Sequence, residues 1–270
     1  MPDPAVVLIT GASSGLGKAT GQFLASRGYR VYGTARNPGR YPDFEDFPLL
    51  AMDVCQPESV RAAVARLLEQ EGRIDVLINN AGVGITGPME ETPYSEVCEA
   101  LETNFHGPLR VMGAVAPQMR KQGSGFIVNI TSIAGYMGLP FRGVYSASKG
   151  ALQVATEAYR MELRPFGIRV ATLAPGDYAT NIASGRYHTP LSETSPYRDT
   201  YGKSLELMDA HVDQGGDPAE VARAVYRILQ KRTPKVHYTV GSPLQRFSLV
   251  LKRILPDTWY ERLLRNHYKL

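Results

Sequence analysis

The sequence is poor in cysteine and in long hydrophobic runs. Its 270 residues include two cysteines, Cys55 and Cys98, too few for the disulfide framework of a small secreted domain. The longest apolar runs, such as residues 6–9, are far shorter than the ~20 residues that a membrane-spanning helix needs. The opening residues show no basic and apolar leader pattern. We therefore expect a cytoplasmic protein in a reducing setting, without a transmembrane span.

Patterns typical of metal and nucleic-acid binding are also missing from the sequence. The five histidines and two cysteines lack the spacing of metal ligands, so we expect no bound metal. The net charge is +4, from 30 Lys and Arg against 26 Asp and Glu, and no zinc-finger, helix-turn-helix or RNA-binding pattern accompanies it. We expect no nucleic-acid partner. With 43% hydrophobic residues, the chain can bury the core of one large domain or two small ones.

What the sequence does contain is an alternation of buried strands and amphipathic helices. Continuous apolar runs predict strands, and apolar residues at helical spacing predict helices between them. Such repetition predicts an α/β fold, a doubly wound parallel sheet flanked by helices on both faces. The predicted strands are 6–9, 31–34, 49–52, 76–78, 126–130, 170–173 and 236–240, and the predicted helices are 18–27, 58–71, 95–120, 146–164 and 218–231.

No linker divides the chain, so we expect residues 1–242 to form one catalytic domain. Within it, residues 177–217 are rich in Tyr, Ser, Thr, Gly and Pro, which predicts a long irregular loop that covers the substrate. Residues 243–270 form a tail with an apolar and basic pattern. We expect this tail to be a helical cap on the core or a dimer contact. The alternative is a basic amphipathic helix that lies on a membrane surface.

A glycine-rich turn joins the first strand to the first helix. Residues 10–17 read Thr-Gly-Ala-Ser-Ser-Gly-Leu-Gly, a G-x-x-x-G-x-G spacing. Glycines let the backbone approach a pyrophosphate, and the helix N-terminus offers free N–H groups to its charge. The alternative is a turn that is merely tight. The residues assigned to cofactor binding here are Gly11, Ser13, Ser14, Gly15, Leu16 and Gly17.

Tyr145 and Lys149 are four residues apart on a predicted helix, so they share one face. An ammonium there stabilises a phenolate and lowers the tyrosine pKa from about 10 toward neutrality. Tyr145 would then serve as an acid and base. The alternative is a surface Tyr–Lys pair.

These motifs recur in the order of a known family. The sequence from about residue 6 to residue 240 resembles the classical short-chain dehydrogenase/reductases, nearest to their steroid- and retinol-type carbonyl reductases. The resemblance implies a Rossmann domain with a seven-stranded parallel sheet and a nicotinamide dinucleotide cofactor. The motifs that carry it are residues 10–17, Asn79-Asn80-Ala81-Gly82, Asn104, Ser132, Tyr145-Ser146-Ala147-Ser148-Lys149, and Pro175-Gly176 with Thr180.

The same resemblance implies a role for each motif. Tyr145 gives a proton to the carbonyl oxygen, Lys149 also binds the nicotinamide ribose, and Ser132 holds the substrate oxygen. Asn104 kinks its helix and holds a water that relays protons from Lys149. The remaining residues contact the cofactor: Asp53 and Val54 at the adenine, Asn80, Ala81 and Gly82 along the dinucleotide, and Pro175, Gly176 and Thr180 at the nicotinamide.

The end of the second strand indicates which dinucleotide is bound. Enzymes that prefer NAD place an acidic residue there for the ribose 2′-hydroxyl, whereas this chain has Ala35 followed by Arg36. A guanidinium suits a 2′-phosphate. We expect NADP(H), with Arg36 as the main determinant and Ser13 or Asn37 assisting. The alternative is a solvated Arg36.

Apolar residues near the catalytic motif suggest the substrate. The residues that we assign to its pocket are Val83, Met137, Leu139, Phe141, Tyr178 and Tyr187. Arg142 and Arg186 also allow an anionic group on the substrate, such as a carboxylate. We expect an NADPH-dependent carbonyl reductase or alcohol dehydrogenase that acts on a hydrophobic steroid-, retinoid- or lipid-like ketone or alcohol. The alternatives are an NAD-dependent dehydrogenase and a non-catalytic NADP-sensing module. By analogy with the family we expect a homodimer.

Overall fold

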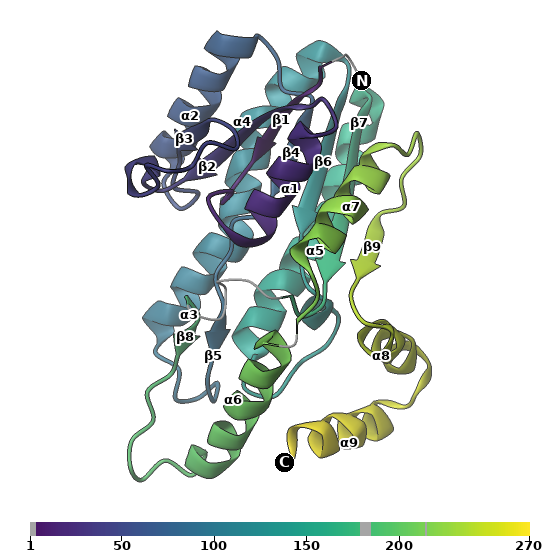
Figure 1. Cartoon of the computed structure of the whole chain (residues 1–270). Helices are drawn as coiled ribbons and strands as arrows, with labels where there is room; N and C mark the ends of the chain where they lie inside the picture. The colour runs from purple at the N-terminus through teal and green to yellow at the C-terminus, as the bar shows by residue number, and fades with distance from the viewer. Residues whose placement is uncertain (1–3, 179–184, 214) are drawn as a thin grey trace.

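Seven parallel strands form the central sheet of the protein (Figure 1). The computed structural model describes residues 4–178, 185–213 and 215–270, with the side chains of residues 209–213 left out. The strand order β3-β2-β1-β4-β6-β7-β9 reverses direction between β1 and β4, the point where doubly wound folds bind ligands. The predicted fold is confirmed. The strands are β1 (Val6–Ile9), β2 (Arg30–Ala35), β3 (Leu49–Ala51), β4 (Val76–Asn79), β6 (Gly125–Ile130), β7 (Ile168–Pro175) and β9 (His237–Val240).

Helices cover both faces of this sheet. Successive side chains of a strand point to opposite faces, so Val7 and Ile9 pack toward α1 (Gly15–Ala25) and α7 (Pro218–Leu229). Val6 and Leu8 pack toward the other layer, which consists of α2 (Pro57–Glu71), α4 (Gly107–Gln122) and α5 (Gly143–Leu163). Both layers are mainly apolar at the sheet. The polar ends of the strands therefore carry the features that distinguish this protein.

The single helix predicted over residues 95–120 is wrong, because a π-helical turn interrupts it. The structure has α3 (Tyr94–Leu101), the π-helical turn η2 (Glu102–His106) and then α4. The backbone N–H of Gly107 reaches back five residues to the carbonyl of Glu102. Pro108 has no N–H for a regular α-helical bond, and the side chain of Asn104 binds the backbone of Val83 instead of facing solvent.

The prediction of an irregular segment over residues 177–217 is wrong in part. Residues 198–213 form α6 (Arg198–Asp213), and β8 (Tyr187–His188) pairs with β5 (Ile85–Thr86) in a small second sheet. Tyr201 fixes the start of α6, because its buried hydroxyl donates to the Thr86 carbonyl at 3.0 Å. Shorter 3-10 turns are η1 (Pro38–Arg40), η3 (Ile133–Tyr136) and η4 (Arg164–Phe166).

The tail forms two helices, α8 (Pro243–Ile254) and α9 (Asp257–Tyr268). A capping box between Ser242 and Gln245 starts α8. In α9, the buried Tyr260 donates its hydroxyl to the Met137 sulfur at 2.7 Å, so the tail packs on η3. Figure 1 shows both helices beyond the carboxyl ends of the strands. Among the described residues, no helix is both long and apolar enough to cross a membrane.

A buried hydrogen-bond chain holds α5 to the sheet. Asn79 of β4 donates to the Asn129 Oδ1 of β6 at 2.8 Å, and the Asn129 Nδ2 donates to the Thr156 Oγ1 of α5 at 2.8 Å. All three side chains are buried. The chain sets the position of α5, which carries the Tyr145–Lys149 pair, relative to the ends of the strands.

We expect Asn129→Ala to lower the free energy of unfolding by about 2–4 kcal/mol, since it removes two buried hydrogen bonds and leaves a cavity beside Asn79 and Thr156. Chemical denaturation followed by circular dichroism measures this loss. The control is Asn266→Ala on the surface of α9, with an expected change of about 0.5 kcal/mol or less. Equal stability of the two variants would show that the chain does not hold α5.

Candidate active site

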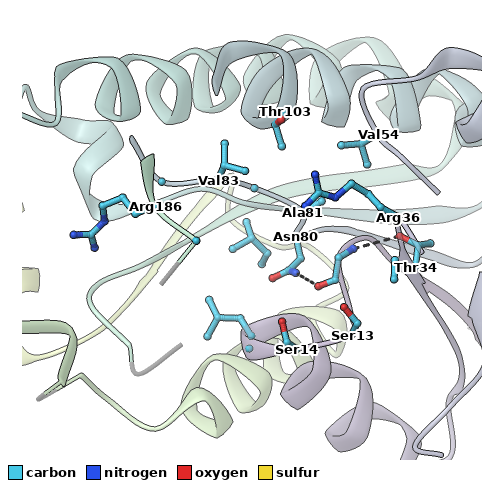
Figure 2. Close-up of a pocket in the computed structure, with 18 of the residues that line it drawn as sticks. Ser13, Ser14, Thr34, Arg36, Val54, Asn80, Ala81, Val83, Thr103 and Arg186 are labelled. Atoms are coloured by element: carbon cyan, nitrogen blue, oxygen red, sulfur yellow. Dashed lines mark hydrogen bonds between the residues drawn. The ribbon is translucent and has the colours of Figure 1, made fainter. Parts of the chain in front are cut away.

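A cavity of about 890 Å³ opens at the carboxyl ends of the strands. Figure 2 shows Ser13 and Ser14 on one side of it, Thr103 on the opposite side, and Arg36 and Arg186 toward its two ends. Most of the predicted site residues meet here although they come from seven segments of the chain. Those that line the cavity are Gly11, Ser13, Ser14, Gly15, Leu16, Arg36, Asn37, Asp53, Val54, Asn80, Ala81, Gly82, Val83, Ser132, Tyr145, Lys149, Pro175, Gly176 and Tyr178.

Two of the turn glycines are required by close backbone packing. Gly11 has a φ of +63°, and a Cβ on it would lie 2.9 Å from the Ala81 Cα. A Cβ on Gly17 would lie 2.4 Å from the Gly11 carbonyl oxygen, so Gly17 stands behind the cavity wall and supports it. Asn80 locks the two loops together, because its Nδ2 donates to the carbonyls of Gly11 and Thr10 at 2.9 and 3.0 Å (Figure 2 draws the first).

The N-terminus of α1 opens onto the cavity. Ser14 is its N-cap in extended conformation, and within the described chain the Ser14 side chain makes no capping hydrogen bond. The N–H groups of the first turn have no intrahelical acceptors, and Ser14, Gly15 and Leu16 line the cavity. A glycine cradle beside free N–H groups and a positive helix dipole fits the diphosphate of a dinucleotide.

Polar side chains after β2 and β3 lie farther along the cavity. Asn37 accepts a hydrogen bond from the Gly39 N–H at 3.1 Å and so caps η1. Asp53 accepts one from the Cys55 N–H at 2.9 Å, which fixes its carboxylate at the end of β3. Arg36 extends from the end of β2 to the cavity wall. The arrangement fits an adenosine moiety at this end.

Three predicted catalytic side chains meet at the other end of the cavity. Tyr145 and Lys149 lie one turn apart on α5, and both are buried. Ser132 lies two residues after the end of β6, at the N-cap of η3. It forms a hydrogen bond with Tyr145 and accepts another from the Ala134 N–H at 3.1 Å. Lys149 Nζ donates to the Ile130 carbonyl oxygen at 3.2 Å. The site thus places a hydroxyl pair beside a buried amine.

The pKa of Tyr145 differs from the sequence-based expectation. Burial raises this pKa above its ordinary value, and the Arg142 guanidinium, which lies over the Tyr145 ring at 5.4 Å, opposes the rise only in part. Burial also lowers the pKa of Lys149 to about 8. The prediction that Lys149 lowers the pKa of Tyr145 is therefore wrong for the protein without cofactor. Burial removes both side chains from water and so disfavours the charged form of each. At neutral pH Tyr145 is a protonated phenol.

Asn104 lies behind the cavity wall rather than on it. The side chain is fully buried; its Oδ1 accepts from the Val83 N–H at 2.8 Å, and its Nδ2 donates to the Val83 carbonyl at 2.9 Å. A Cβ on Gly82 would lie 3.0 Å from Asn104 Oδ1 and 3.2 Å from Lys149 Nζ, so both groups sit directly behind this glycine. Asn104 holds the loop after β4 in place. Its part in a proton relay stays a prediction.

The predicted substrate residues separate into three groups. Val83 and Tyr178 line the cavity, while Leu139 and Tyr187 pack with Tyr145 in one apolar cluster. Met137 instead lies beneath Tyr260 of α9, and the Phe141 ring packs against Tyr197 and Tyr201 near the start of α6. The structure thus gives Met137 and Phe141 packing positions rather than places on the cavity wall. Thr180 lies outside the described residues.

Two features of the site were not predicted from the sequence. Asp177 lines the cavity and accepts a hydrogen bond from the Gln245 Nε2 of α8 at 2.7 Å. Tyr268 of α9 is buried and forms a hydrogen bond with Arg142, which also lines the cavity. The position of Asp177 directly after β7 was a usable signal. No local pattern indicated that the tail returns to the site.

The buried Lys149 makes a testable contribution to stability. Its folded pKa is about 8, against about 10.4 in an unfolded chain. Between these values the unfolded state holds more protons, so stability rises with pH there, and the full penalty is present below pH 8. We expect Lys149→Met to raise the free energy of unfolding at pH 7 by about 1–3 kcal/mol and to flatten its pH dependence from about pH 8 to 10.

Urea denaturation across this pH range measures both effects. The control is the exposed Lys121→Met, with an expected change of about 0.5 kcal/mol or less. A less stable Lys149→Met protein at pH 7 would contradict the assignment of a costly buried amine.

Comparisons with known proteins identify the family of the chain. The short chain dehydrogenase family matches residues 5–190. The 3-ketodihydrosphingosine reductase of Bacteroides thetaiotaomicron is 39% identical to the chain over 268 residues, 99% of each protein. The crystal structure of a short-chain dehydrogenase from Streptomyces avermitilis superposes with a TM-score of 0.84 at 32% identity, and covers 97% of this chain and 98% of its own.

Related structures contain either nicotinamide dinucleotide. A short chain dehydrogenase from Burkholderia cenocepacia in complex with NADP has a TM-score of 0.78 at 26% identity, covering 97% of this chain and 98% of that one. A relative from Burkholderia phymatum in complex with NAD has a TM-score of 0.80 at 27% identity, covering 93% of each chain. With the Ser132–Tyr145–Lys149 arrangement and the glycine turn, these matches show that the chain belongs to the short-chain dehydrogenase/reductase family of oxidoreductases.

Proposed function

We propose that the protein is an NADPH-dependent carbonyl reductase, or the corresponding alcohol dehydrogenase in reverse, for a lipid-like substrate. The observation that carries this proposal is the buried phenol of Tyr145, hydrogen-bonded to Ser132 and one helical turn before Lys149. A sensor of the dinucleotide would need the glycine turn but not this proton donor. The reaction class follows from the proton donor and the cofactor cradle lying in one cavity.

Residues of this chain fit each part of NADP(H). The first turn of α1 and the Gly11 cradle suit the diphosphate, and Asp53 and Val54 suit the adenine. Arg36 suits the 2′-phosphate, since Ala35 puts no carboxylate beside it. When bound, the dinucleotide supplies or accepts the hydride. The relatives include both NAD and NADP complexes, so the preference for NADP(H) rests on the residues after β2.

The side chains at the other end move the proton. Burial raises the pKa of Tyr145, so its hydroxyl holds a proton that it can donate to a carbonyl oxygen becoming an alkoxide. Ser132 donates or accepts a hydrogen bond at the same oxygen and orients it. The Lys149 amine, with a pKa of about 8, gains or releases a proton close to working pH and so can restore the phenol. Asn104 positions the Val83 loop beside these groups.

The apolar surroundings of Tyr145 support a substrate with a long apolar part. Val83 lines the cavity, and Leu139 and Tyr187 pack with Val83 and Tyr145 in an apolar cluster next to it. Burial of alkyl surface against this cluster favours binding. At the cavity wall the carboxylate of Asp177 suits an ammonium group. The 39% identical relative is named for 3-ketodihydrosphingosine, a long-chain amino ketone, and we propose a ketone of this kind before a steroid or retinoid.

We propose a homodimer that forms through α4 and α5. Val154 and Met161 of α5 leave large apolar side chains exposed on the surface opposite the sheet. Pairing of these helices would cover them.

We expect Tyr145→Phe to lower kcat for ketone reduction by about 10²- to 10⁴-fold, because it removes the proton donor and leaves the ring in place. NADPH oxidation followed at 340 nm measures the loss, and NADPH binding by fluorescence should stay within about threefold of the original protein. Tyr159→Phe, on the same helix, is the matched control and should retain activity. Undiminished turnover in Tyr145→Phe would overturn the mechanism.

We expect Arg36→Gln to raise the KM for NADPH by about tenfold or more, because a charge-assisted bond to the 2′-phosphate is lost. The KM for NADH should change little. Steady-state kinetics with both cofactors gives the ratio, and Arg66→Gln on α2, which is not among the residues that line the cavity, is the control. Equal changes for the two cofactors would show that Arg36 does not read the 2′-phosphate.

A further inference from the structure

The positive charge of the protein is concentrated in the tail, residues 243–270. This segment has six Lys and Arg against two Asp and Glu, a net charge of +4, which equals that of the whole chain. The remaining 242 residues are therefore neutral in sum. The tail alone presents a strongly cationic surface.

The outward face of α8 is apolar. Phe247, Val250 and Ile254 follow one another at three- and four-residue steps, so they share one face of the helix. Phe247 is 54% exposed and Ile254 67% exposed. Arg246 and Arg253 are also exposed and, by helical geometry, flank this face on one side. Large apolar side chains and arginines are thus exposed to solvent side by side on α8.

The second helix of the tail repeats this pattern. Trp259, the only tryptophan of the chain, is 67% exposed, and Leu263, one turn later, is exposed beside it. By helical spacing their face is turned away from the one that buries Tyr260 and Tyr268. The exposed Arg262 lies next to Trp259 on this face, as the arginines lie beside the apolar face of α8. An exposed tryptophan beside an arginine is typical of helices that lie in a membrane interface.

The inward faces of the same helices hold the tail in place. Tyr260 contacts Met137, Gln245 donates to Asp177, and Tyr268 forms a hydrogen bond with Arg142. These contacts account for how the tail folds, so its outward face is not needed to keep the helices on the body. Because Asp177 and Arg142 line the cavity, the tail also lies beside the entrance to the site.

We propose that the outward face of α8 and α9, formed by Phe247, Val250, Ile254, Trp259 and Leu263 with the adjacent arginines, docks on an anionic lipid bilayer. The apolar side chains enter the interface between head groups and acyl chains, and the arginines contact lipid phosphates. A second copy of this chain fits the face poorly, since pairing would bring two surfaces of +4 together.

Docking in this way would bring the cavity next to the bilayer. A long-chain substrate could then pass between lipid and cavity along the tail instead of crossing bulk water. The docking itself does not depend on the proposed reaction, and its test contains neither cofactor nor ketone.

The test is flotation of the full-length protein with vesicles of pure phosphatidylcholine and with vesicles that contain increasing fractions of phosphatidylglycerol. We expect the bound fraction to rise with the phosphatidylglycerol content and to fall with added salt. The double variant Phe247→Ser/Trp259→Ser should lower the partition coefficient by about tenfold or more. Arg253→Gln and Arg262→Gln should lower it by about fivefold each.

Matched controls carry the same changes elsewhere on the surface. Met89→Ser removes a similarly exposed apolar side chain from the turn before α3, and Arg66→Gln removes an exposed arginine from α2. Both should bind vesicles as the original protein does. Light scattering without lipid should show that Phe247→Ser/Trp259→Ser keeps the oligomeric state.

Three results would overturn the proposal. The first is absence of binding at high phosphatidylglycerol content, and the second is a loss of binding in the controls equal to that in the tail variants. The third is dissociation of an oligomer by Phe247→Ser/Trp259→Ser together with no vesicle binding, which would assign this face to a second copy of the chain.

Discussion

The burial of the Lys149 amine is the constraint on which the site depends. An ammonium removed from water is costly, and the structure offers Lys149 a backbone carbonyl, that of Ile130, as a hydrogen-bond acceptor. Two glycines allow the chain to pass close to this residue. A Cβ on Gly82 would lie 3.2 Å from the Lys149 Nζ, and one on Gly135 would lie 3.0 Å from the Lys149 carbonyl carbon in the backbone of α5. The loop after β4 therefore passes close to the amine, and η3 passes close to the backbone of α5.

The same exclusion of water acts on Tyr145 in the opposite sense. Desolvation disfavours the charged form of each group, so it raises the pKa of the phenol and lowers that of the amine. In the proposed reaction, the phenol keeps its proton until it donates it to the substrate oxygen, and the amine exchanges protons near pH 8. Ser132, which follows β6, forms a hydrogen bond with the phenol. Burial thus favours the neutral form of both groups before the proposed proton transfer.

The regular parts of the molecule could be predicted from the sequence because their signals are local. Contiguous apolar runs indicated the seven strands, and the four-residue spacing of Tyr145 and Lys149 placed them on one helix face. The π-helical turn could not be found in this way. It depends on bonds between Asn104 and Val83, residues of separate elements, and the helical periodicity around it is unbroken.

Long-range contacts also explain the other differences. Residues 198–213 have a weak apolar pattern, and α6 is held partly through Tyr201 and its distant partner Thr86. The sequence predicts an amphipathic tail, but the contacts of the tail with Asp177, Met137 and Arg142 join residues 68, 123 and 126 positions apart. Helical periodicity carries no information about such contacts. For this reason the sequence predicts that Met137 contacts the substrate, whereas in the structure Met137 packs against α9.

The central claim, that water is excluded from the amine beneath Tyr145, is tested most directly by titrating Lys149 itself. NMR of protein labelled with ¹³C at lysine Cε follows each amine with pH, and the spectrum of Lys149→Met identifies the resonance. The account predicts a midpoint near pH 8 for Lys149 in the free protein. A midpoint near the ordinary lysine value of about 10.4 would contradict it, because it would mean that the amine remains hydrated.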